Sequence, residues 1–320
     1  LHITGMRASY TTEARERRSF WICQSPHRPY AARAKQPMDP EPSNEPCATP
    51  LRWSALSDVG RFRKNNEDAF LALTFDAREL KYLGKAGEGN LGMGDFVFAV
   101  SDGMGGAKSG EFASKIAVEQ ITKLLPKSFK LSAQRLDAGL TDVVRELFAR
   151  IHENMTQMGR YYDECAGMGA TLSLCWVMPE WIYFGHIGDS RIYFLPKDRP
   201  MVQVTEDHTY VGWMQRQGMI NEREARTHPR RNSLNQVLGG GKRMIDPQIG
   251  RIGWEPGDRL LICSDGVVDG LWNHKIEDMA RNNTAEGALG TVDLVRAAVN
   301  DSGRDNTTAL IVELGWCAQA

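Results

Sequence analysis

The chain has 320 residues, of which 42% are hydrophobic and 25% are charged, and its formal net charge at pH 7 is −1. This is the composition of a globular protein with enough apolar residues for one large core. The near-neutral charge gives no support to long-range attraction toward nucleic acid or an anionic membrane, and no apolar run reaches the roughly 20 residues that span a bilayer. We therefore expect neither nucleic acid nor a membrane as a partner.

The six cysteines contain no CxxC pair, and two of them lie within apolar, strand-like runs. This pattern is typical of reduced thiols, so we expect a cytoplasmic location.

The first 50 residues differ in composition from the rest of the chain. They carry seven basic and five acidic side chains, and five prolines crowd the segment 37–50. No continuous apolar run is present of the kind that a secretion signal needs. We expect residues 1–50 to be a disordered leader or an artefact of the start site, with Met6 and Met38 as other possible starts. A basic arm that docks a partner is the alternative.

From residue 51 onward the pattern predicts strands and helices in turn. Apolar and polar residues alternate over 53–57, and compact apolar runs over 69–73 and 96–100 predict two further strands. We interpret the glycine-rich stretch 84–94 as an enlarged loop between the second and third strands.

Two long helices are predicted next. Residues 109–125 place apolar side chains at helical spacing, and we expect Pro126 to end this helix because proline has no N–H to donate. A second amphipathic helix is predicted over about 132–158. Two consecutive long helices favour an antiparallel pair packed on a sheet.

The second half begins with three apolar segments, 170–177, 181–187 and 191–195, joined by links too short for a crossover helix. Short links indicate strands that pair antiparallel. After a polar, arginine-rich interval the pattern predicts a strand over 259–264, a helical stretch over about 274–300 and a final strand over 307–314. Runs of strands interleaved with pairs of helices indicate the α+β class, arranged as a layered sandwich.

A hydrophobic run leads into Ser-Asp-Gly twice, over 98–103 and over 261–266. A buried strand ending in Asp-Gly would place a carboxylate at the edge of a sheet, where glycine permits a sharp turn. Other carboxylates stand in the turn-like motifs NNED, GDSR and GRDN. The carboxylates of these five motifs are Glu67, Asp68, Asp102, Asp189, Asp265 and Asp305. Together they suggest a metal centre.

The type of ligand narrows the choice of metal. No histidine or cysteine shares the motifs of Asp102, Asp265 and Asp305, and oxygen-only ligation favours Mg²⁺ or Mn²⁺ over zinc. Two such ions about 3.5 to 4 Å apart can hold a bridging hydroxide and clamp a phosphoryl group. Asp102 is the natural bridging ligand, and Arg63 offers a planar fork for phosphate oxygens.

Each assignment has a structural alternative. A single Asp-Gly is usually only a turn, and it is the repetition after buried runs that supports Asp102 and Asp265. Asp189 is alternatively a turn residue paired with Arg191, and Arg63 a solvated charge. For His186 we favour packing within a strand, and for His208 the organisation of the segment that follows it, over metal binding.

Six motifs in sequence order closely resemble the bacterial branch of the metal-dependent type 2C protein serine/threonine phosphatases, over about residues 51–314. They are GRFRKNNEDAF (60–70), VSDGMGGAKSGEFAS (100–114), GMGATL (167–172), GHIGDSRIY (185–193), LICSDGVVDGL (261–271) and GRDNTT (303–308). The resemblance implies a catalytic domain over 51–316, with a flap over about 205–240. It also implies a four-layer α-β-β-α sandwich, in which a mostly antiparallel β-sandwich is flanked by helix pairs.

The resemblance further implies two tightly bound Mn²⁺ or Mg²⁺ ions at one end of the sandwich. By motif, Asp102 bridges both ions and the Gly103 carbonyl binds one of them. Asp265 and Asp305 complete the ligands of the other ion. Glu67 and Asp68 act on the metal waters, Arg63 clamps the substrate phosphate, and Asp189 with Asp265 holds a third, labile ion.

The implied activity is hydrolysis of phosphoserine and phosphothreonine in proteins by direct attack of a hydroxide that bridges the two ions. A catalytically silent regulatory module of the same fold, or another metal-dependent phosphohydrolase, is the alternative. The resemblance implies a monomer, and a cognate serine/threonine kinase is the candidate substrate. One position departs from many eukaryotic relatives: Met104 stands where they carry a histidine that resembles the general acid, and methionine cannot donate a proton.

Overall fold

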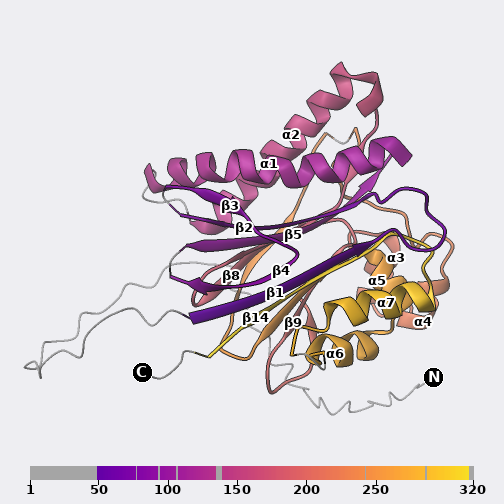
Figure 1. Cartoon of the computed structure of the whole chain (residues 1–320). Coiled ribbons are helices and arrows are strands. Elements are labelled where there is room, and N and C mark those ends of the chain that lie inside the picture. Colours follow the sequence, from indigo (N-terminus) through magenta and orange to yellow (C-terminus); the bar gives the residue numbers. More distant parts are fainter. Residues whose placement is uncertain are drawn as a thin grey trace, which may run out of the picture.

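The computed structural model describes residues 49–316 except 77, 93, 106, 135–138, 242 and 285–286. The predicted leader therefore lies outside the described residues, apart from its last two positions. Two β-sheets face each other, and helices cover the outer face of each sheet (Figure 1). This confirms the predicted α+β class and its four layers.

The first sheet has six strands in the order β10-β9-β13-β14-β1-β4. Their bounds are Val202–Gln203 (β10), Arg191–Leu195 (β9), Arg259–Cys263 (β13), Thr307–Leu314 (β14), Thr49–Asp58 (β1) and Ala86–Leu91 (β4). All of its pairings are antiparallel.

The second sheet has eight strands, six of them in the order β11-β6-β5-β7-β8-β12, while β2 pairs with β5 and β3 with β2. Their bounds are Leu238–Gly239 (β11), Gly169–Ala170 (β6), Asp95–Met104 (β5), Leu172–Val177 (β7), Trp181–Ile187 (β8), Gln248–Gly253 (β12), Asp68–Phe75 (β2) and Leu80–Tyr82 (β3). These pairings are antiparallel as well.

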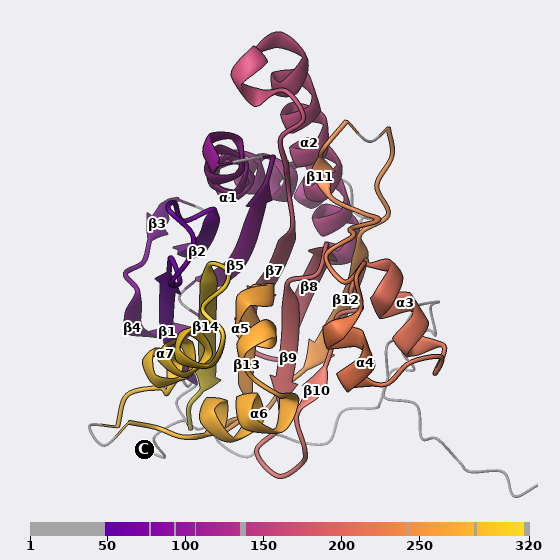
Figure 2. The same ribbon diagram turned by 90° about the vertical axis from the view of Figure 1, so that its right-hand side faces the viewer.

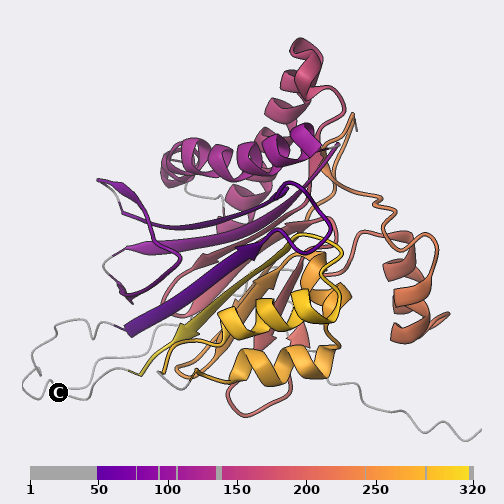
Figure 3. The same cartoon turned by 45° about the vertical axis from the view of Figure 1, so that its right-hand side comes forward.

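Helices α1 (Ala107–Gln134) and α2 (Leu140–Tyr161), followed by the 3-10 turn η1 (Asp163–Cys165), cover the eight-stranded sheet. Helices α5 (Asp265–Gly270), α6 (Asn273–Arg281) and α7 (Thr291–Asp301) cover the six-stranded sheet (Figure 3). The remaining helices, α3 (Tyr210–Arg216) and α4 (Glu222–Thr227), belong to the predicted flap and stand at one side of the sandwich (Figure 2).

Three apolar clusters hold the layers together, one beneath each helical layer and one between the sheets. The central cluster contains Trp53, Phe96 and Phe98, whose rings contact one another with centroids 5.9 to 6.3 Å apart. Phe98 is fully buried, and removing such a ring from a core typically costs about 3 to 5 kcal/mol. Burial between the sheets therefore fixes the distance at which their ends face each other.

The glycine-rich stretch 84–94 is not the loop that we predicted. Most of it forms β4, which pairs with β1 at the edge of the six-stranded sheet. A Cβ on Gly87 would lie 2.5 Å from the Trp53 ring, and one on Gly89 would lie 2.6 Å from the Phe96 ring. These glycines leave space for the aromatic rings that pack against β4. The need for that space comes from tertiary packing, which the local sequence does not reveal.

Two helix predictions were wrong in their bounds. The first helix does not end at Pro126 but continues to Gln134. A proline inside a helix removes one hydrogen bond and crowds the preceding turn, which can kink a helix without ending it. The predicted start of the second helix at about 132 falls inside α1. In the last third, the expected helical stretch 274–300 is two helices, α6 and α7, and the short α5 was missed.

The link between β8 and β9 is also different from the prediction. Strands β7 and β8 pair antiparallel as expected, but β8 and β9 lie in different sheets. The chain passes from one sheet to the other through Gly188, whose φ of +110° favours glycine. Asp189 therefore stands on the crossing between the sheets.

Among the described residues, no helix combines the length and the apolar character needed to cross a bilayer.

Candidate active site

A cleft of about 440 Å³ opens at the end of the sandwich where the motifs meet. Its lining contains Arg63, Glu67, Asp102, Gly103, Asp189, Asp265 and Asp305, together with Phe62, Lys64, Asn65, Met104, Gly105, Thr171, Asn232 and Leu234. Asn232 and Leu234 come from the segment predicted as the flap, which therefore borders the cleft. Of the predicted site residues, only Asp68 is not in the lining. It is buried just beneath.

Asp102 and Gly103 lie inside β5, which continues to Met104, so the first Ser-Asp-Gly does not end its strand as we predicted. Gly103 is required by close packing: a Cβ there would lie 1.9 Å from the carbonyl oxygen of Gly110 in α1. The N–H of Gly103 donates to the Glu67 carbonyl at 3.0 Å. The glycine thus lets the start of α1 and the Glu67 loop approach Asp102.

The second Ser-Asp-Gly does end a strand. Strand β13 stops at Cys263, Ser264 precedes the first turn of α5, and Asp265 is the first residue of that helix. A Cβ on Gly266 would lie 2.0 Å from the Asn306 carbonyl oxygen. Close approach of a neighbouring backbone therefore explains the glycine of both motifs.

Asp68 and Asp102 stand directly opposite each other on the neighbouring strands β2 and β5. Opposite residues of an antiparallel pair share one face of the sheet with their Cβ atoms about 4.5 to 5.5 Å apart, and like charges in this position repel. The Ser264 hydroxyl donates to Oδ2 of Asp68 at 2.7 Å, whereas Oδ1 is buried without a protein partner.

Asn306 fixes the loop that carries Arg63 and Glu67. Its side-chain amide donates to the carbonyls of Val59 and Asn65 at 2.9 and 3.0 Å, and its Oδ1 accepts from the N–H of Glu67 at 2.7 Å. We did not single out Asn306 or Ser264 from the sequence. Their position directly beside Asp305 and Asp265 was the signal available.

The Arg63 guanidinium donates to Oδ2 of Asp305 at 2.7 Å and lies 3.9 Å from the carboxylate of Glu67. The Asp305 hydrogen bond is the main cause that raises the pKa of Arg63, so this side chain stays charged. Its side chain is 45% exposed at the cleft. Arg63 is therefore not a solvated charge without a partner. Its guanidinium contacts carboxylates and lies at the cleft, where a bound anion can also contact it.

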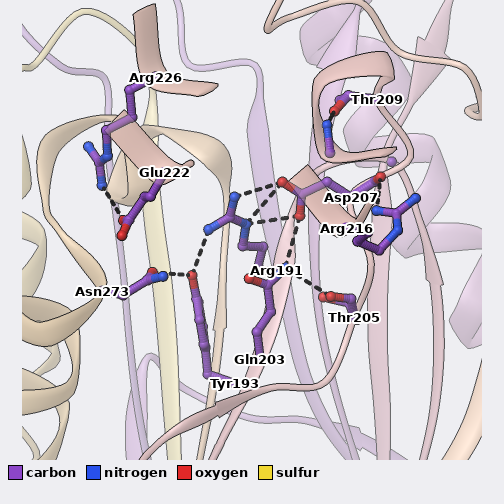
Figure 4. A network of polar contacts seen from close by, with 12 residues as sticks. Arg191, Tyr193, Gln203, Thr205, Asp207, Thr209, Arg216, Glu222, Arg226 and Asn273 are labelled. Atoms are coloured by element: carbon purple, nitrogen blue, oxygen red, sulfur yellow. Dashed lines mark hydrogen bonds and ion pairs between the residues drawn. The ribbon is translucent and has the colours of Figure 1, made fainter. Parts of the chain in front are cut away.

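Asp189 lies on the crossing between the sheets and lines the cleft. Arg191 does not pair with it: the guanidinium donates to both oxygens of Asp207, at 2.7 and 2.9 Å, and to the Tyr193 hydroxyl at 2.9 Å (Figure 4). The Tyr193 hydroxyl in turn donates to Asn273 at 3.1 Å. The structural alternative in which Arg191 neutralises Asp189 through hydrogen bonds is therefore wrong.

Burial and mutual repulsion raise the pKa values of four aspartates at the cleft, Asp68, Asp102, Asp189 and Asp265. Burial raises the pKa of Asp68 to about 6 and that of Asp189 to about 7. The pKa values of Asp102 and Asp265 are raised well above the ordinary range, first by burial and then by neighbouring aspartates. Aspartates from distant segments thus lie close enough to repel one another, which is unfavourable unless a cation joins them.

The donors present fit a hard divalent cation. They are all carboxylate or carbonyl oxygens, and Oδ1 of Asp265, like that of Asp68, is buried without a protein partner. Across the described ranges, however, no three or more histidine, cysteine, aspartate or glutamate side chains are already gathered as the ligands of one ion. The fit therefore rests on the donor chemistry and the unpartnered oxygens.

His186 and His208 lie beside the crossing, with ring centroids 5.1 Å apart. His186 is fully buried between the Ser173 hydroxyl and the Gly188 carbonyl, at 2.9 and 3.1 Å. His208 Nδ1 accepts from the N–H of Gly188, and its backbone bonds to Gly188 and Asn235. His186 is thus packed within its strand, as we favoured, and His208 bonds to Asn235 of the flap, in line with the organising role that we favoured for it.

Comparison with known proteins agrees with this fold. The family model of protein phosphatase 2C matches residues 88–296. Protein phosphatase PhpP of Streptococcus pneumoniae is 32% identical over 271 residues, which is 82% of this chain and 98% of that protein. The chain therefore belongs to the protein phosphatase 2C family, as a metal-dependent serine/threonine phosphatase of the bacterial type.

Solved structures show the same architecture. The crystal structure of the Mycobacterium tuberculosis serine/threonine phosphatase PstP/Ppp matches with a TM-score of 0.66 and 27% identity, over 83% of this chain and 100% of that chain. The catalytic domain of the phosphatase PstP, solved in complex with 2 manganese ions, matches with a TM-score of 0.64 and 26% identity, over 84% and 100% of the two chains.

Proposed function

We propose that this phosphatase hydrolyses phosphoserine and phosphothreonine in proteins with two divalent ions, Mn²⁺ or Mg²⁺, bound in the cleft. The carrying observation is the set of aspartates from distant motifs that line one cleft, where neighbouring aspartates help to raise the pKa values of Asp102 and Asp265. One buried oxygen of Asp265, and one of Asp68 beneath the cleft, have no protein partner. The manganese ions of the PstP structure support the choice of metal.

Asp102, the Gly103 carbonyl, Asp265 and Asp305 would hold the two ions, with Glu67 and Asp68 bonding to their waters and Asp189 with Asp265 holding a third, weaker ion. When bound, the two ions supply the Lewis acidity that turns water into a nucleophile at neutral pH and offsets the phosphoryl charge. No side chain of this set needs to act as a covalent nucleophile.

Arg63 orients the substrate. A guanidinium bonds two phosphate oxygens at once, and its anchoring to Asp305 holds the fork at the cleft before substrate arrives. The leaving alkoxide needs a proton, and Met104 at the cleft cannot provide it. We propose that a water molecule is the acid in this site.

The proposal is tested by phosphate release from a phosphothreonine peptide as Mn²⁺ is added to metal-free protein. We expect Mn²⁺-dependent release that Asp102→Asn reduces at least about 100-fold. The matched control is Asp198→Asn, because Asp198 is an exposed aspartate outside the cleft that forms an ion pair with its neighbour Arg199. An inactive wild type across Mn²⁺ and Mg²⁺ would favour the silent module. Rapid turnover of nucleotides without release from phosphopeptides would favour another phosphohydrolase.

We also propose a protein partner and a cellular location for this phosphatase. A phosphorylated protein is the substrate class, and we further propose a cognate serine/threonine kinase as one such protein, with the phosphatase acting as a cytoplasmic monomer. The three cysteines that the structure describes, Cys165, Cys175 and Cys263, are free and buried, which supports the cytoplasmic part. Phosphoproteomics of a deletion strain would identify the substrate.

A further inference from the structure

The strand pairing of β5 is interrupted beside Asp102, where no ladder pair joins Ser101 and Asp102 to Leu172 and Thr171. Strand β5 pairs with β6 at Gly103 and Ala170 and with β7 at Val100 and Ser173, and the same register places Thr171 opposite Asp102. Thr171 itself belongs to neither β6 nor β7. The ladder therefore opens at the residue that faces the central carboxylate of the cleft.

Hydroxyl groups replace one of the backbone bonds at this opening. The N–H of Thr171 donates to the Asp102 carbonyl at 2.8 Å, as an antiparallel pair requires. The return bond is different: the N–H of Asp102 donates to Oγ1 of Thr171 at 2.9 Å, and the Thr171 carbonyl accepts from the Ser101 hydroxyl at 2.6 Å. The backbone of Asp102 is thus held by a side chain.

The same Thr171 hydroxyl reaches the crossing between the sheets. Its Oγ1 lies 2.5 Å from Oγ of Ser190, the residue after Asp189, and both side chains are buried. Its methyl group lies against Gly188, where a Cβ would come within 2.5 Å of it. One threonine therefore contacts the strand of Asp102 and both neighbours of Asp189.

We propose that Thr171 is a positioning residue whose hydroxyl ties the Asp102 strand to the Asp189 crossing and so sets the spacing of these two carboxylates across the cleft. The inference rests on the proposed two-ion function. The bond joins Thr171, between β6 and β7 of one sheet, to Ser190, which directly precedes β9 of the other sheet. Because a hydrogen bond is directional, it adds to the packing between the sheets in setting this spacing.

The test is manganese binding to the full chain, measured by calorimetry on metal-free protein. Thr171→Val keeps the shape and removes the hydroxyl, and we expect it to weaken manganese binding at least about tenfold. Thr171→Ser keeps the hydroxyl, and we expect a loss below about threefold. The Mn²⁺ concentration for half-maximal phosphopeptide hydrolysis should rise by the same factors.

The matched control is Thr74→Val, since Thr74 lies near the opposite end of β2 and donates to the Asp95 carbonyl at 3.1 Å. The Thr74→Val variant loses one hydrogen bond of a hydroxyl group and should bind manganese as the wild type does. If Thr171→Val and Thr171→Ser both lower the melting temperature in EDTA and both bind manganese like the wild type, Thr171 is merely structural and the inference is wrong.

Ser190→Ala keeps the inference testable if Thr171→Val does not fold. It removes only the bond to the crossing, so manganese binding should weaken. If Thr171→Val does fold, the double variant should bind manganese no worse than Thr171→Val alone. Unchanged binding in Ser190→Ala, or losses that multiply, would contradict the tie. A wild type that binds no manganese overturns the proposed function and this inference together, whereas normal binding in Thr171→Val overturns the inference alone.

Discussion

At the scale of single residues, the aspartates of the cleft are buried close to one another, and this raises the pKa values of Asp68, Asp102 and Asp265. Asp68 and Asp102 stand opposite each other, and Asp265 has one buried oxygen with no protein partner. Neighbouring side chains supply only part of the compensation, as the Ser264 hydroxyl does for Asp68. We therefore predict that, without metal, the charges of these buried aspartates lower the free energy of unfolding.

We expect Asp265→Asn to melt higher than the wild type in EDTA at pH 7.5. The raised pKa of Asp265 means that its negative charge is unfavourable in the folded state, and the amide removes that charge. A gain of about 1 to 2 kcal/mol would raise the melting temperature by several degrees. Asp198→Asn, at the exposed surface, should change nothing, and a lower melting temperature for Asp265→Asn would refute the prediction.

His186 should make the protein sensitive to acid. Burial lowers its pKa to about 3 from an ordinary 6.5, so between these pH values the unfolded chain takes up a proton that the folded chain does not. The free energy of unfolding must then fall as the pH drops from 6.5 toward 3, by at most about 1.4 kcal/mol per pH unit.

Urea unfolding of His186→Gln from pH 7 to 4 measures this effect. The variant should lose less stability on acidification than the wild type, while His274→Gln, at an exposed position, should follow the wild type. Parallel pH profiles for all three proteins would show that His186 is not the group responsible.

At the scale of elements, the flap is fastened to the body by buried charge. Arg191 on β9 and Asp207, just before α3, form a pair whose side chains are only 14% and 13% exposed. Further along, the Arg226 guanidinium of α4 lies 4.1 Å from the Trp272 ring centroid and donates to the Leu271 carbonyl beside α6. The first contact joins the flap to β9, and the Arg226 contacts join it to the segment between α5 and α6.

Breaking the buried pair should be costly. Arg191→Ala and Asp207→Ala each leave a buried charge without its partner, so we expect each to lose about 3 to 5 kcal/mol in urea unfolding. The double variant should lose less than the sum of the two. Lys123→Ala breaks the exposed pair with Glu119 on α1 and should cost well under 1 kcal/mol. Additive losses for Arg191 and Asp207 would contradict the pairing.

For the molecule as a whole, the two sheets and their aromatic core form the rigid frame, and the cleft joins segments from Arg63 to Asp305. A ligand that binds only where these segments meet must stabilise the entire fold. Bound metal should therefore raise the free energy of unfolding in addition to its role in catalysis.

Adding Mn²⁺ to metal-free protein should raise its melting temperature. At 100 times the dissociation constant the gain is about 2.7 kcal/mol, which corresponds to several degrees for a chain of this size. Asp102→Asn should abolish most of the shift, and Asp198→Asn should keep it. Calorimetric melting curves decide this, and an equal shift in Asp102→Asn would exclude Asp102 as a ligand.

The sequence by itself determined the fold class, most of the apolar sheet-forming runs and the carboxylates that line the cleft, because hydrophobic periodicity and short motifs can be read directly from the order of the residues. Only the tertiary structure decided why Gly87 and Gly103 are glycines, that Asp189 stands between two sheets, and that Arg191 bonds to Asp207. Those features depend on which backbones and side chains approach one another across the core, and contacts between residues far apart in the chain leave no periodic signal in it.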